Sequence, residues 1–137
     1  MADMIRTAHY FKVQVSDKPG EGAKMLGVLG DAGINLLAFS GFPRNRRAQL
    51  DFVVSDPTVF KQVAKQAKWK VQGPKACFVV DGDDRPGATA DVLAKLAEVK
   101  INVTAVDAVA AGQGRFGALL WVKPRDVKKA TKALGVG

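Results

Sequence analysis

The chain has 137 residues, of which 47% are hydrophobic, and a formal net charge of +8. This length fits one ordinary domain or two very small ones, and the apolar content argues against a disordered chain. A single cysteine, Cys77, excludes an intramolecular disulfide and fits a reducing compartment. The first ten residues lack the apolar stretch of a secretory signal, and no apolar run is long enough to span a bilayer. We therefore expect a cytoplasmic protein with no membrane partner.

An excess of positive charge is typical of proteins that bind nucleic acid or membrane lipid. Most of the clustered lysines, however, follow two stripes: Lys61, Lys65 and Lys68, then Lys128, Lys129 and Lys132. Each stripe opposes apolar positions, as the solvated face of an amphipathic helix does. The one dense cluster is formed by Arg44, Arg46 and Arg47. We interpret these residues as solvated helix faces and a loop, and a nucleic-acid partner is not expected.

An internal repeat predicts the architecture. The segment Asp17-Lys18-Pro19-Gly20 recurs 67 residues later as Asp84-Arg85-Pro86-Gly87. The same offset relates five further pairs: Leu26 with Leu93, Leu29 with Leu96, Ile34 with Ile101, Asn35 with Asn102, and Ala38 with Ala105. One extra residue in the second copy then aligns Val54 with Val122. We therefore predict two copies of one unit, residues 1–73 and 74–137.

In the first copy, alternating apolar residues predict a strand over residues 10–15, ended by the turn 17–20. Apolar residues at helical spacing then predict a helix that ends at Ala32, with Gly33 as a left-handed C-cap. Residues 34–42 and 47–54 are typical of two strands joined by a turn. Asp56 as N-cap and Pro57 at the first helical position mark the next helix. Residues 69–71 predict a short fourth strand, and residues 73–74 a linker.

In the second copy, the pattern predicts strands over residues 77–80, 101–109 and 116–122, and helices over residues 87–99 and 126–134. The chain stops soon after Gly135, so the second copy lacks a fourth strand of its own. Because an open sheet edge is a liability, either a second subunit or another segment should cover it, and residues 4–8 are one candidate. The β-α-β-β-α-β order predicts an α+β fold of two ferredoxin-like units, each an antiparallel sheet with helices on one face.

The order strand, Asp-x-Pro-Gly, amphipathic helix, Gly-Ile-Asn, strand resembles the ACT domain, a small regulatory module of amino-acid metabolism. The resemblance spans residues 9–134 and is closest to short proteins made of two ACT modules without a catalytic domain. It implies a regulatory protein, not an enzyme, that binds an amino acid at a module or subunit interface and needs no cofactor. It also implies a homodimer, and a regulated enzyme in a separate chain.

In the ACT family, the ligand contacts the loop after the first strand and the Asn-bearing start of the second strand. By this resemblance, the candidate ligand-binding residues are Asp17, Pro19, Gly20, Glu21, Gly22, Gly33, Ile34 and Asn35 in the first unit, and Asp84, Pro86, Gly87, Ala88, Ile101 and Asn102 in the second. The chemistry suits a zwitterion. Free N–H groups at a helix start receive a carboxylate, Asn35 offers a donor and an acceptor, and Asp17 either accepts the ammonium group or caps the helix. The alternative is a turn and helix start without a ligand.

Three glycines in the first helix and one lysine depart from the family pattern. Gly22, and Thr89 in the second copy, stand where the family commonly has a bulky apolar residue, and we interpret Gly22 as room for a ligand. Gly27 and Gly30 each cost about 1 kcal/mol of helix stability relative to Ala, and we interpret them as permitting close helix packing. Lys100 replaces the glycine expected before Ile101, which predicts a weaker C-cap and a poorer second site.

Catalytic and metal sites are not expected from the remaining reactive residues. His9 is the only histidine, so a catalytic triad or a His-containing metal site cannot be assembled within one chain. Cys77, among apolar residues, is typical of a packed thiol. The carboxylates at positions 81, 83 and 84 lack the order and the distal Glu of a calcium loop. We therefore expect no catalytic residue and no bound metal.

Two alternative functions remain open at this stage. The RNA-recognition module has the same element order, and Phe116 and Trp121 could serve as its stacking platforms. Asp51 in the equivalent strand of the first copy opposes phosphate binding. The other alternative is a dimerisation module that binds no ligand.

Overall fold

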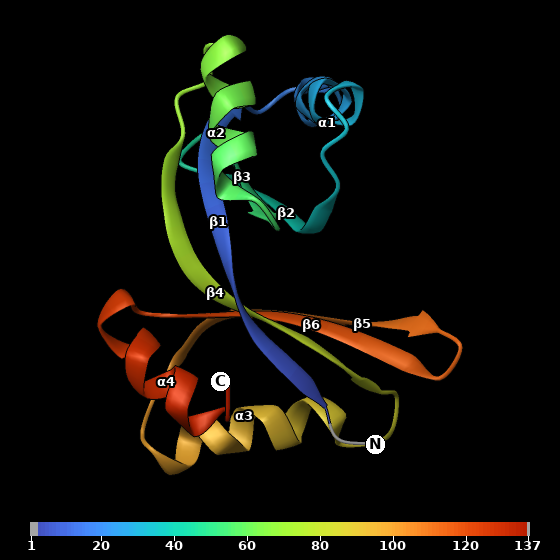
Figure 1. Ribbon diagram of the computed structural model, residues 1–137, viewed down its shortest axis with the longest axis vertical. Helices are drawn as coiled ribbons and strands as arrows, with labels where there is room; N and C mark the ends of the chain where they lie inside the picture. Colours follow the sequence, from blue (N-terminus) through green and yellow to red (C-terminus); the bar gives the residue numbers. More distant parts are fainter. Residues whose placement is uncertain (1–2, 137) are drawn as a thin grey trace. The chain divides into compact units, whose positions relative to one another are not determined.

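The computed structural model describes residues 3–136, which form an α+β fold with six strands and four α-helices (Figure 1). The elements in chain order are β1 (Met4–Ser16), α1 (Glu21–Asp31), β2 (Leu36–Arg44), β3 (Arg47–Val54), α2 (Pro57–Gln66), β4 (Gln72–Asp83), α3 (Ala88–Glu98), β5 (Val103–Gly112), β6 (Arg115–Val122), a 3-10 turn (Pro124–Asp126) and α4 (Val127–Ala133). Hydrogen-bonded strands follow the order β2-β3-β1-β4-β6-β5. The expected fold class is confirmed.

The chain divides into two compact units. One is His9–Lys75, and the other joins the N-terminal segment through Ala8 to the residues from Ala76 onward. The long strands β1 and β4 therefore each contribute residues to both units. The sequence division at residues 73 and 74 assigned the N-terminal segment to the first unit, whereas its contacts place it in the second.

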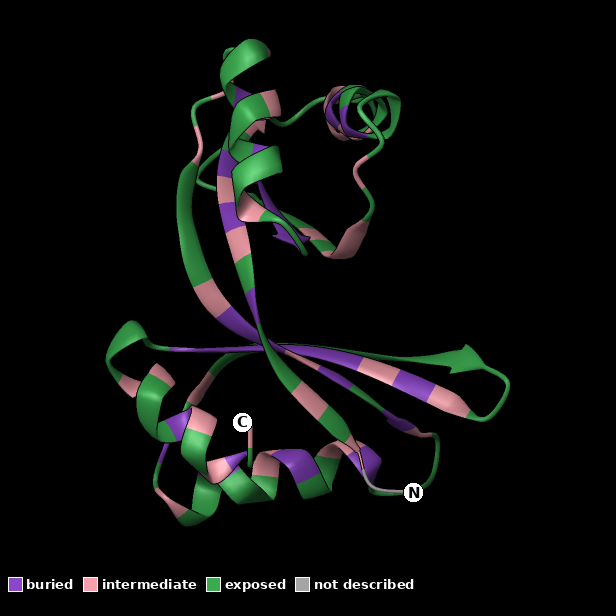
Figure 2. Ribbon diagram, viewed as in Figure 1, coloured by how far each residue is buried: buried purple, intermediate pink, exposed green. Residues whose placement is uncertain are grey.

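In the first unit, the strands β1, β3 and β2 pair in antiparallel register, with Phe11 opposite Phe52. The first residues of β4 belong to this unit and follow β1 in the strand order. Aromatic rings fill the space between the sheet and the helices: the ring centroids of Phe11 and Phe60 are 4.6 Å apart, and those of Phe52 and Phe60 are 5.5 Å apart. The buried positions alternate along β1 (Figure 2), as expected for a strand with one covered face.

In the second unit, β4 pairs with β6 and β6 with β5, again antiparallel. Residues 4–8 of β1 lie next to β4 in the strand order, where a fourth strand is needed. Ile5 packs against the core of this unit, and Asp3 lies so close to Gly82 that a Cβ there would overlap its carboxylate. The N-terminal segment is thus the cover for the edge that the sequence left open.

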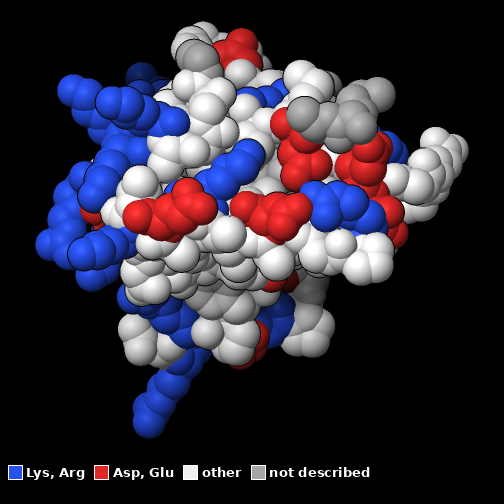
Figure 3. Space-filling model, turned by 90° about the horizontal axis from the view of Figure 1, so that it is seen from below, with Lys and Arg blue, Asp and Glu red and all other residues white. Residues whose placement is uncertain are grey.

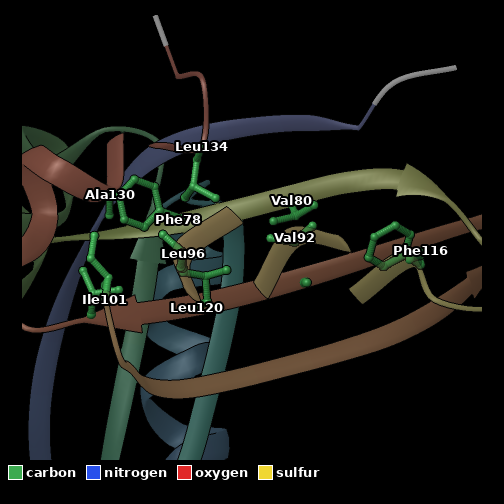
Figure 4. Close-up of a cluster of buried hydrophobic side chains, with 12 residues drawn as sticks. Phe78, Val80, Val92, Leu96, Ile101, Phe116, Leu120, Ala130 and Leu134 are labelled. Atoms are coloured by element: carbon green, nitrogen blue, oxygen red, sulfur yellow. The ribbon is translucent and has the colours of Figure 1, made fainter. Parts of the chain in front are cut away.

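The core of the second unit lies between its sheet and the two helices α3 and α4 (Figure 4). Its largest fully buried side chains come from different elements: Phe78 and Val80 from β4, Val92 and Leu96 from α3, and Leu120 from β6. Ala130 of α4 is fully buried. The small side chain at this position lets α4 approach the sheet closely.

All four helices end in the same way. The residue after the C-cap is left-handed in each: φ is 76° at Gly33, 62° at Lys68, 61° at Lys100 and 74° at Gly135. The next residue is apolar and donates its N–H to the carbonyl five residues earlier, as in Ile34 to Leu29 (2.9 Å) and Ile101 to Leu96 (3.0 Å). This is the Schellman motif. The Schellman motif after α3 is therefore complete although Lys100 stands in place of glycine. The expected weakness of this C-cap lies in the left-handed backbone of a lysine.

Three expectations about the first unit are wrong. Trp69 and Val71 do not form a strand, because the left-handed residue Lys68 turns the chain so that both side chains pack on the core, and β4 begins at Gln72. Residues 73–74 lie inside β4 and are not a linker. Gly27 and Gly30 have no packing role, since both are exposed and a Cβ at either would meet no atom within 4 Å.

Because left-handed backbone costs a non-glycine residue about 1–2 kcal/mol, Lys100→Gly should stabilise the chain. The greater freedom of glycine in the unfolded state offsets part of this gain, so we expect the free energy of unfolding to rise by about 0.5–1 kcal/mol. Urea unfolding measures this change. Lys95→Gly, within α3, is the control and should lose about 1 kcal/mol. A loss of stability in Lys100→Gly would contradict the left-handed assignment.

The exposed glycines of α1 predict a second gain in stability. Gly27→Ala and Gly30→Ala should each raise the free energy of unfolding by about 0.5–1 kcal/mol, because alanine restricts the unfolded chain and no neighbour is displaced. Thermal unfolding of the single and double variants checks this. Gly33→Ala should instead destabilise, since its φ of 76° is unfavourable for alanine. If Gly27→Ala and Gly30→Ala destabilise, these glycines have a packing role after all.

Candidate functional site

A pocket of about 330 Å³ opens at the start of α3 in the second unit. One wall is the loop before α3 and its first turn, the other is the middle of β5, and one residue comes from β6. The lining residues are Asp84, Arg85, Gly87, Ala88, Thr89, Ala90, Ala108, Val109, Ala110 and Phe116. The pocket therefore combines a helix start with an apolar strand surface.

The first turn of α3 has no side-chain cap. Its N-cap residue, Gly87, is left-handed with φ 82° and offers no side-chain acceptor. Asp91 donates its N–H to the Gly87 carbonyl (3.0 Å), so the earlier N–H groups of the turn belong to Thr89 and Ala90, which line the pocket. Uncapped N–H groups and the positive end of the helix dipole favour an anion at this position.

Charged groups of both signs border this helix start. Arg85 forms an ion pair with Asp91, and its Nη1 donates to the Pro86 carbonyl at 3.4 Å. This pairing, first through the hydrogen bond and then through charge, raises the pKa of Arg85. Asp84 is exposed, and its backbone N–H donates to the Gly114 carbonyl at 2.8 Å, which fixes the loop against the β5–β6 hairpin. The loop side of the pocket thus carries an exposed carboxylate on a backbone position that is held by the hairpin.

A second arginine joins the end of β4, just before this loop, to β6. Arg115 of β6 contacts Asp81 at 2.7 Å and Asp83 at 2.6 Å. Both carboxylates raise its pKa, chiefly the hydrogen bond to Asp81. Two of the acidic residues before α3, Asp81 and Asp83, are therefore paired with an arginine. Among residues 3–136, no three His, Cys, Asp or Glu side chains are grouped as a metal site.

The structure brings together only part of the predicted second site. Asp84, Gly87 and Ala88 line the pocket, and Pro86 lies between them in the loop. Ile101 is buried in the core, and Asn102 is exposed at the other end of β5. At 3.3 Å per residue, Asn102 is about 20 Å along the strand from the pocket. A single unit therefore does not place the asparagine beside the helix start.

The predicted residues of the first unit have equivalent positions. Gly20 is a left-handed N-cap with φ 91° and no side-chain hydrogen bond, so Asp17 does not cap α1. Gly22 has open space around its Cα, as the ligand hypothesis requires. Glu21 contacts Lys18 at 3.6 Å.

The helix end holds the other predicted residues of the first unit. Gly33 forms the C-terminal cap, Ile34 packs on the core and Asn35 is exposed. As in the second unit, the asparagine and the helix start lie at opposite ends of the helix. The bulky apolar contacts of Ile34 and Ile101 make them structural residues.

Sequence reasoning missed the strand wall of the pocket. Ala110 pairs with Phe116 and Ala108 with Ala118 in the β5–β6 hairpin. Both strands were predicted, so the pairing across their hairpin could have indicated that small residues of β5 face the helices. The absence of bulk at Ala108 and Ala110 leaves the space that forms the pocket.

The prediction that Phe116 and Trp121 could serve as stacking platforms for RNA bases is wrong. Phe116 is 5% exposed and packs in the core under the helices, and Trp121 is 7% exposed. Neither ring is available for a base to stack on it. Asp51, on the corresponding strand of the first unit, is also buried and accepts a hydrogen bond from Gln49 at 3.1 Å. Burial raises the pKa of Asp51, an effect that Gln49 and nearby basic residues oppose.

Cys77 and His9, the remaining reactive residues noted in the sequence, each lie on a strand. Cys77 is fully buried in β4, as predicted for a packed thiol, and His9 is exposed on β1. In the described part of the chain, no helix combines the length and the hydropathy that crossing a bilayer demands.

Comparison with known proteins identifies structures with the same fold. No model of a protein family and no curated protein matches the sequence. Protein BT0572 of Bacteroides thetaiotaomicron has a TM-score of 0.80 at 20% identity, with 97% of this chain and 88% of that chain covered. The ligand-free regulatory subunit of aspartate kinase from Thermus thermophilus has a TM-score of 0.64 at 18% identity, covering 98% and 95%. The Thermus flavus regulatory subunit has a TM-score of 0.59 at 16% identity, covering 98% and 94%. Over almost its whole length, the chain therefore has the fold of these regulatory subunits.

Proposed function

We propose that this protein is a non-catalytic regulatory protein that binds an amino acid, and that its two units act as ACT-like modules. The observation that carries the proposal is the pocket at the uncapped start of α3, with a carboxylate beside it. The fold shared with aspartate kinase regulatory subunits supports a regulatory role. Their description as subunits also supports a target enzyme in a separate chain.

The lining of the pocket suits each part of an amino acid. The α-carboxylate would accept from the N–H groups of Thr89 and Ala90, where the helix dipole adds to the attraction. The ammonium group would pair with Asp84 on the loop. An apolar side chain would lie against Ala108, Ala110 and the ring of Phe116. Small ligands typically occupy pockets of about 300–1,000 Å³, and this pocket is at the lower end of that range.

The open edge of β5 supports a homodimer. β5 is the last strand in the sheet order, and Val106 and Val109 on it are 39% and 66% exposed. Asp107 is the only charged residue within the strand, so little charge protects this edge from pairing. An unprotected apolar edge is suited to strand addition by a second copy.

Antiparallel pairing of two β5 strands would also complete the site. A two-fold axis at Val106 sets residue 102 of one copy opposite residue 110 of the other. Asn102 of one subunit would then reach the pocket that Ala110 lines in its partner. In this arrangement the ligand lies at the subunit interface, and binding favours the associated state. This is how a protein without a catalytic site can transmit the presence of a metabolite.

A thermal-shift panel of the twenty L-amino acids tests the proposed function. A ligand at 100 times its Kd should stabilise the chain by about 2.7 kcal/mol. Thr89→Leu should remove binding in the second unit by filling the pocket, and Gly22→Leu should remove binding in the first by filling the open space at the start of α1. Titration calorimetry of each variant with the amino acid gives the number of ligand-binding sites that remain. Unchanged affinity and stoichiometry in both variants, with circular dichroism as the folding control, would refute these sites.

Sedimentation velocity tests the role of the β5 edge. Val106→Lys places like charges opposite each other across the two-fold axis, so we expect the dimer to dissociate and amino-acid affinity to fall at least tenfold. Val28→Lys is the matched control, because Val28 is 36% exposed on α1 and not on a strand edge. A dimeric Val106→Lys variant, or equal dissociation of both variants, would contradict an interface formed by the β5 edge.

A further inference from the structure

The net charge of +8 is concentrated in two short segments, one in each unit. The first is residues 57–75, which include α2, and the second is residues 123–136, which include α4. We call them the two lysine segments. Together they hold ten of the 21 basic residues: Lys61, Lys65, Lys68, Lys70, Lys75, Lys123, Arg125, Lys128, Lys129 and Lys132. They hold one of the 13 acidic residues, Asp126. The rest of the chain is close to neutral.

These basic side chains are exposed, and none of them is in an ion pair found among the described residues, although the charge of Lys75 opposes the raised pKa of Asp51. All ten residues are exposed to solvent. Among residues 3–136, the ion pairs found join other residues, such as Lys18 with Glu21 and Arg85 with Asp91. The other two helices, α1 and α3, mix both signs of charge. The segregation is therefore specific to the second helix of each unit.

The arrangement costs stability within each helix. Lys61 and Lys65, and likewise Lys128 and Lys132, are four residues apart and lie on one helix face about 6 Å apart along the axis. Like charges at this spacing destabilise a helix by about 0.2–0.5 kcal/mol per pair. A face kept only for solubility would carry both signs. The same costly pattern in two copies that share few residues indicates an anionic partner.

The charge is also segregated on the visible surface of the molecule. In Figure 3, most Lys and Arg side chains lie along one side of the face, and the basic side chains in its middle and on the other side lie beside carboxylates. The buried sides of the helices are occupied by core residues, namely Phe60 and Ala64 of α2 and Ala130 of α4. Apart from Val59 of α2, which is 38% exposed, the surfaces of these helices that are open to a partner are therefore polar or charged.

We propose that the two lysine segments bind the phosphate backbone of a nucleic acid. Protein interfaces are depleted in lysine and rely on aromatic and arginine anchors, and these faces expose no aromatic ring and one arginine, Arg125. Surface helices that bind membranes insert an apolar face into the lipid, but here the apolar faces lie in the cores. Lysine point charges without base-reading groups are suited to sequence-independent contact with phosphates. This surface is separate from the buried strands that failed as a stacking platform.

Fluorescence anisotropy with a labelled 30-nucleotide single-stranded RNA and a duplex DNA of equal length tests the proposal. The wild-type protein should bind both, with log K falling linearly as log salt rises. The variant K128Q/K129Q/K132Q should bind at least tenfold more weakly at 50 mM salt. Each phosphate contact contributes about 0.7 to the slope for a single strand, so losing three lowers its magnitude by about 2. The variant K61Q/K65Q should have a smaller effect of the same kind.

The matched control is K24Q/K95Q/K100Q, which removes three charges from α1 and the α3 region. It should retain the wild-type affinity and slope, and thermal unfolding should show that both triple variants are folded. Three results would overturn the proposal: no nucleic-acid binding at 50 mM salt, equal losses in the control, or binding to phosphatidylserine vesicles or polyglutamate with none to RNA or DNA. Amino-acid stabilisation, measured in parallel, should be unchanged in K128Q/K129Q/K132Q, since its lysines do not line the pocket.

Discussion

Hydrogen bonding along the edges of the second unit's sheet is the constraint on which the rest of this structure depends. Three strands of that unit come from the second repeat, and three strands with two helices leave a backbone edge unpaired. The N-terminal half of β1 closes the edge beside β4. At the opposite edge, β5 is the last strand in the sheet order of the described residues and pairs only with β6. The open edge of β5 and the pocket beside it both follow from the number of strands that the second repeat supplies.

The pocket depends on how helices start and end in this fold. The left-handed residues Gly20 and Gly87 begin α1 and α3 without a side-chain cap, which leaves N–H groups free for a ligand. At the other ends, the Schellman motif satisfies the last carbonyls and directs an apolar residue into the core. In α1 and α3, stability is therefore provided at the C-terminal ends, and the N-terminal ends keep the N–H groups on which the proposed binding depends, whereas α2 is capped at its start by Asp56. That separation also explains why Asn35 and Asn102 lie far from the helix starts in their own units.

The two proposed binding surfaces use different physics. The pocket is small, partly apolar and bordered by single charges, so it selects a ligand by shape and by a few directed hydrogen bonds. The lysine segments are exposed and carry ten basic residues and one acidic residue, so they would act through long-range attraction that salt screens. Neither surface uses the residues of the other. A change in one can therefore be measured without disturbing the other.

Much of this protein was determined by local sequence. The repeat of Asp-x-Pro-Gly, the period of the apolar residues and the cap at Asp56, whose carboxylate accepts from Thr58 and Val59, each act within a few residues. For this reason the order of strands and helices and the fold class could be predicted. The prediction failed where distant contacts compete with local preference. Trp69 joined the aromatic core and not a strand, and the glycines of α1 face solvent and not a neighbouring helix.

Tertiary structure alone decided the site. The wall formed by Ala108 and Ala110 exists because hairpin pairing sets them beside a helix start about 20 residues earlier. Ile101 left the predicted site because the end of α3 turns it into the core. The N-terminal segment became a strand of the second unit because that edge needed a partner. The sequence by itself determined which local elements form, since their hydrogen bonds and caps are local, and the packing of those elements determined which side chains meet.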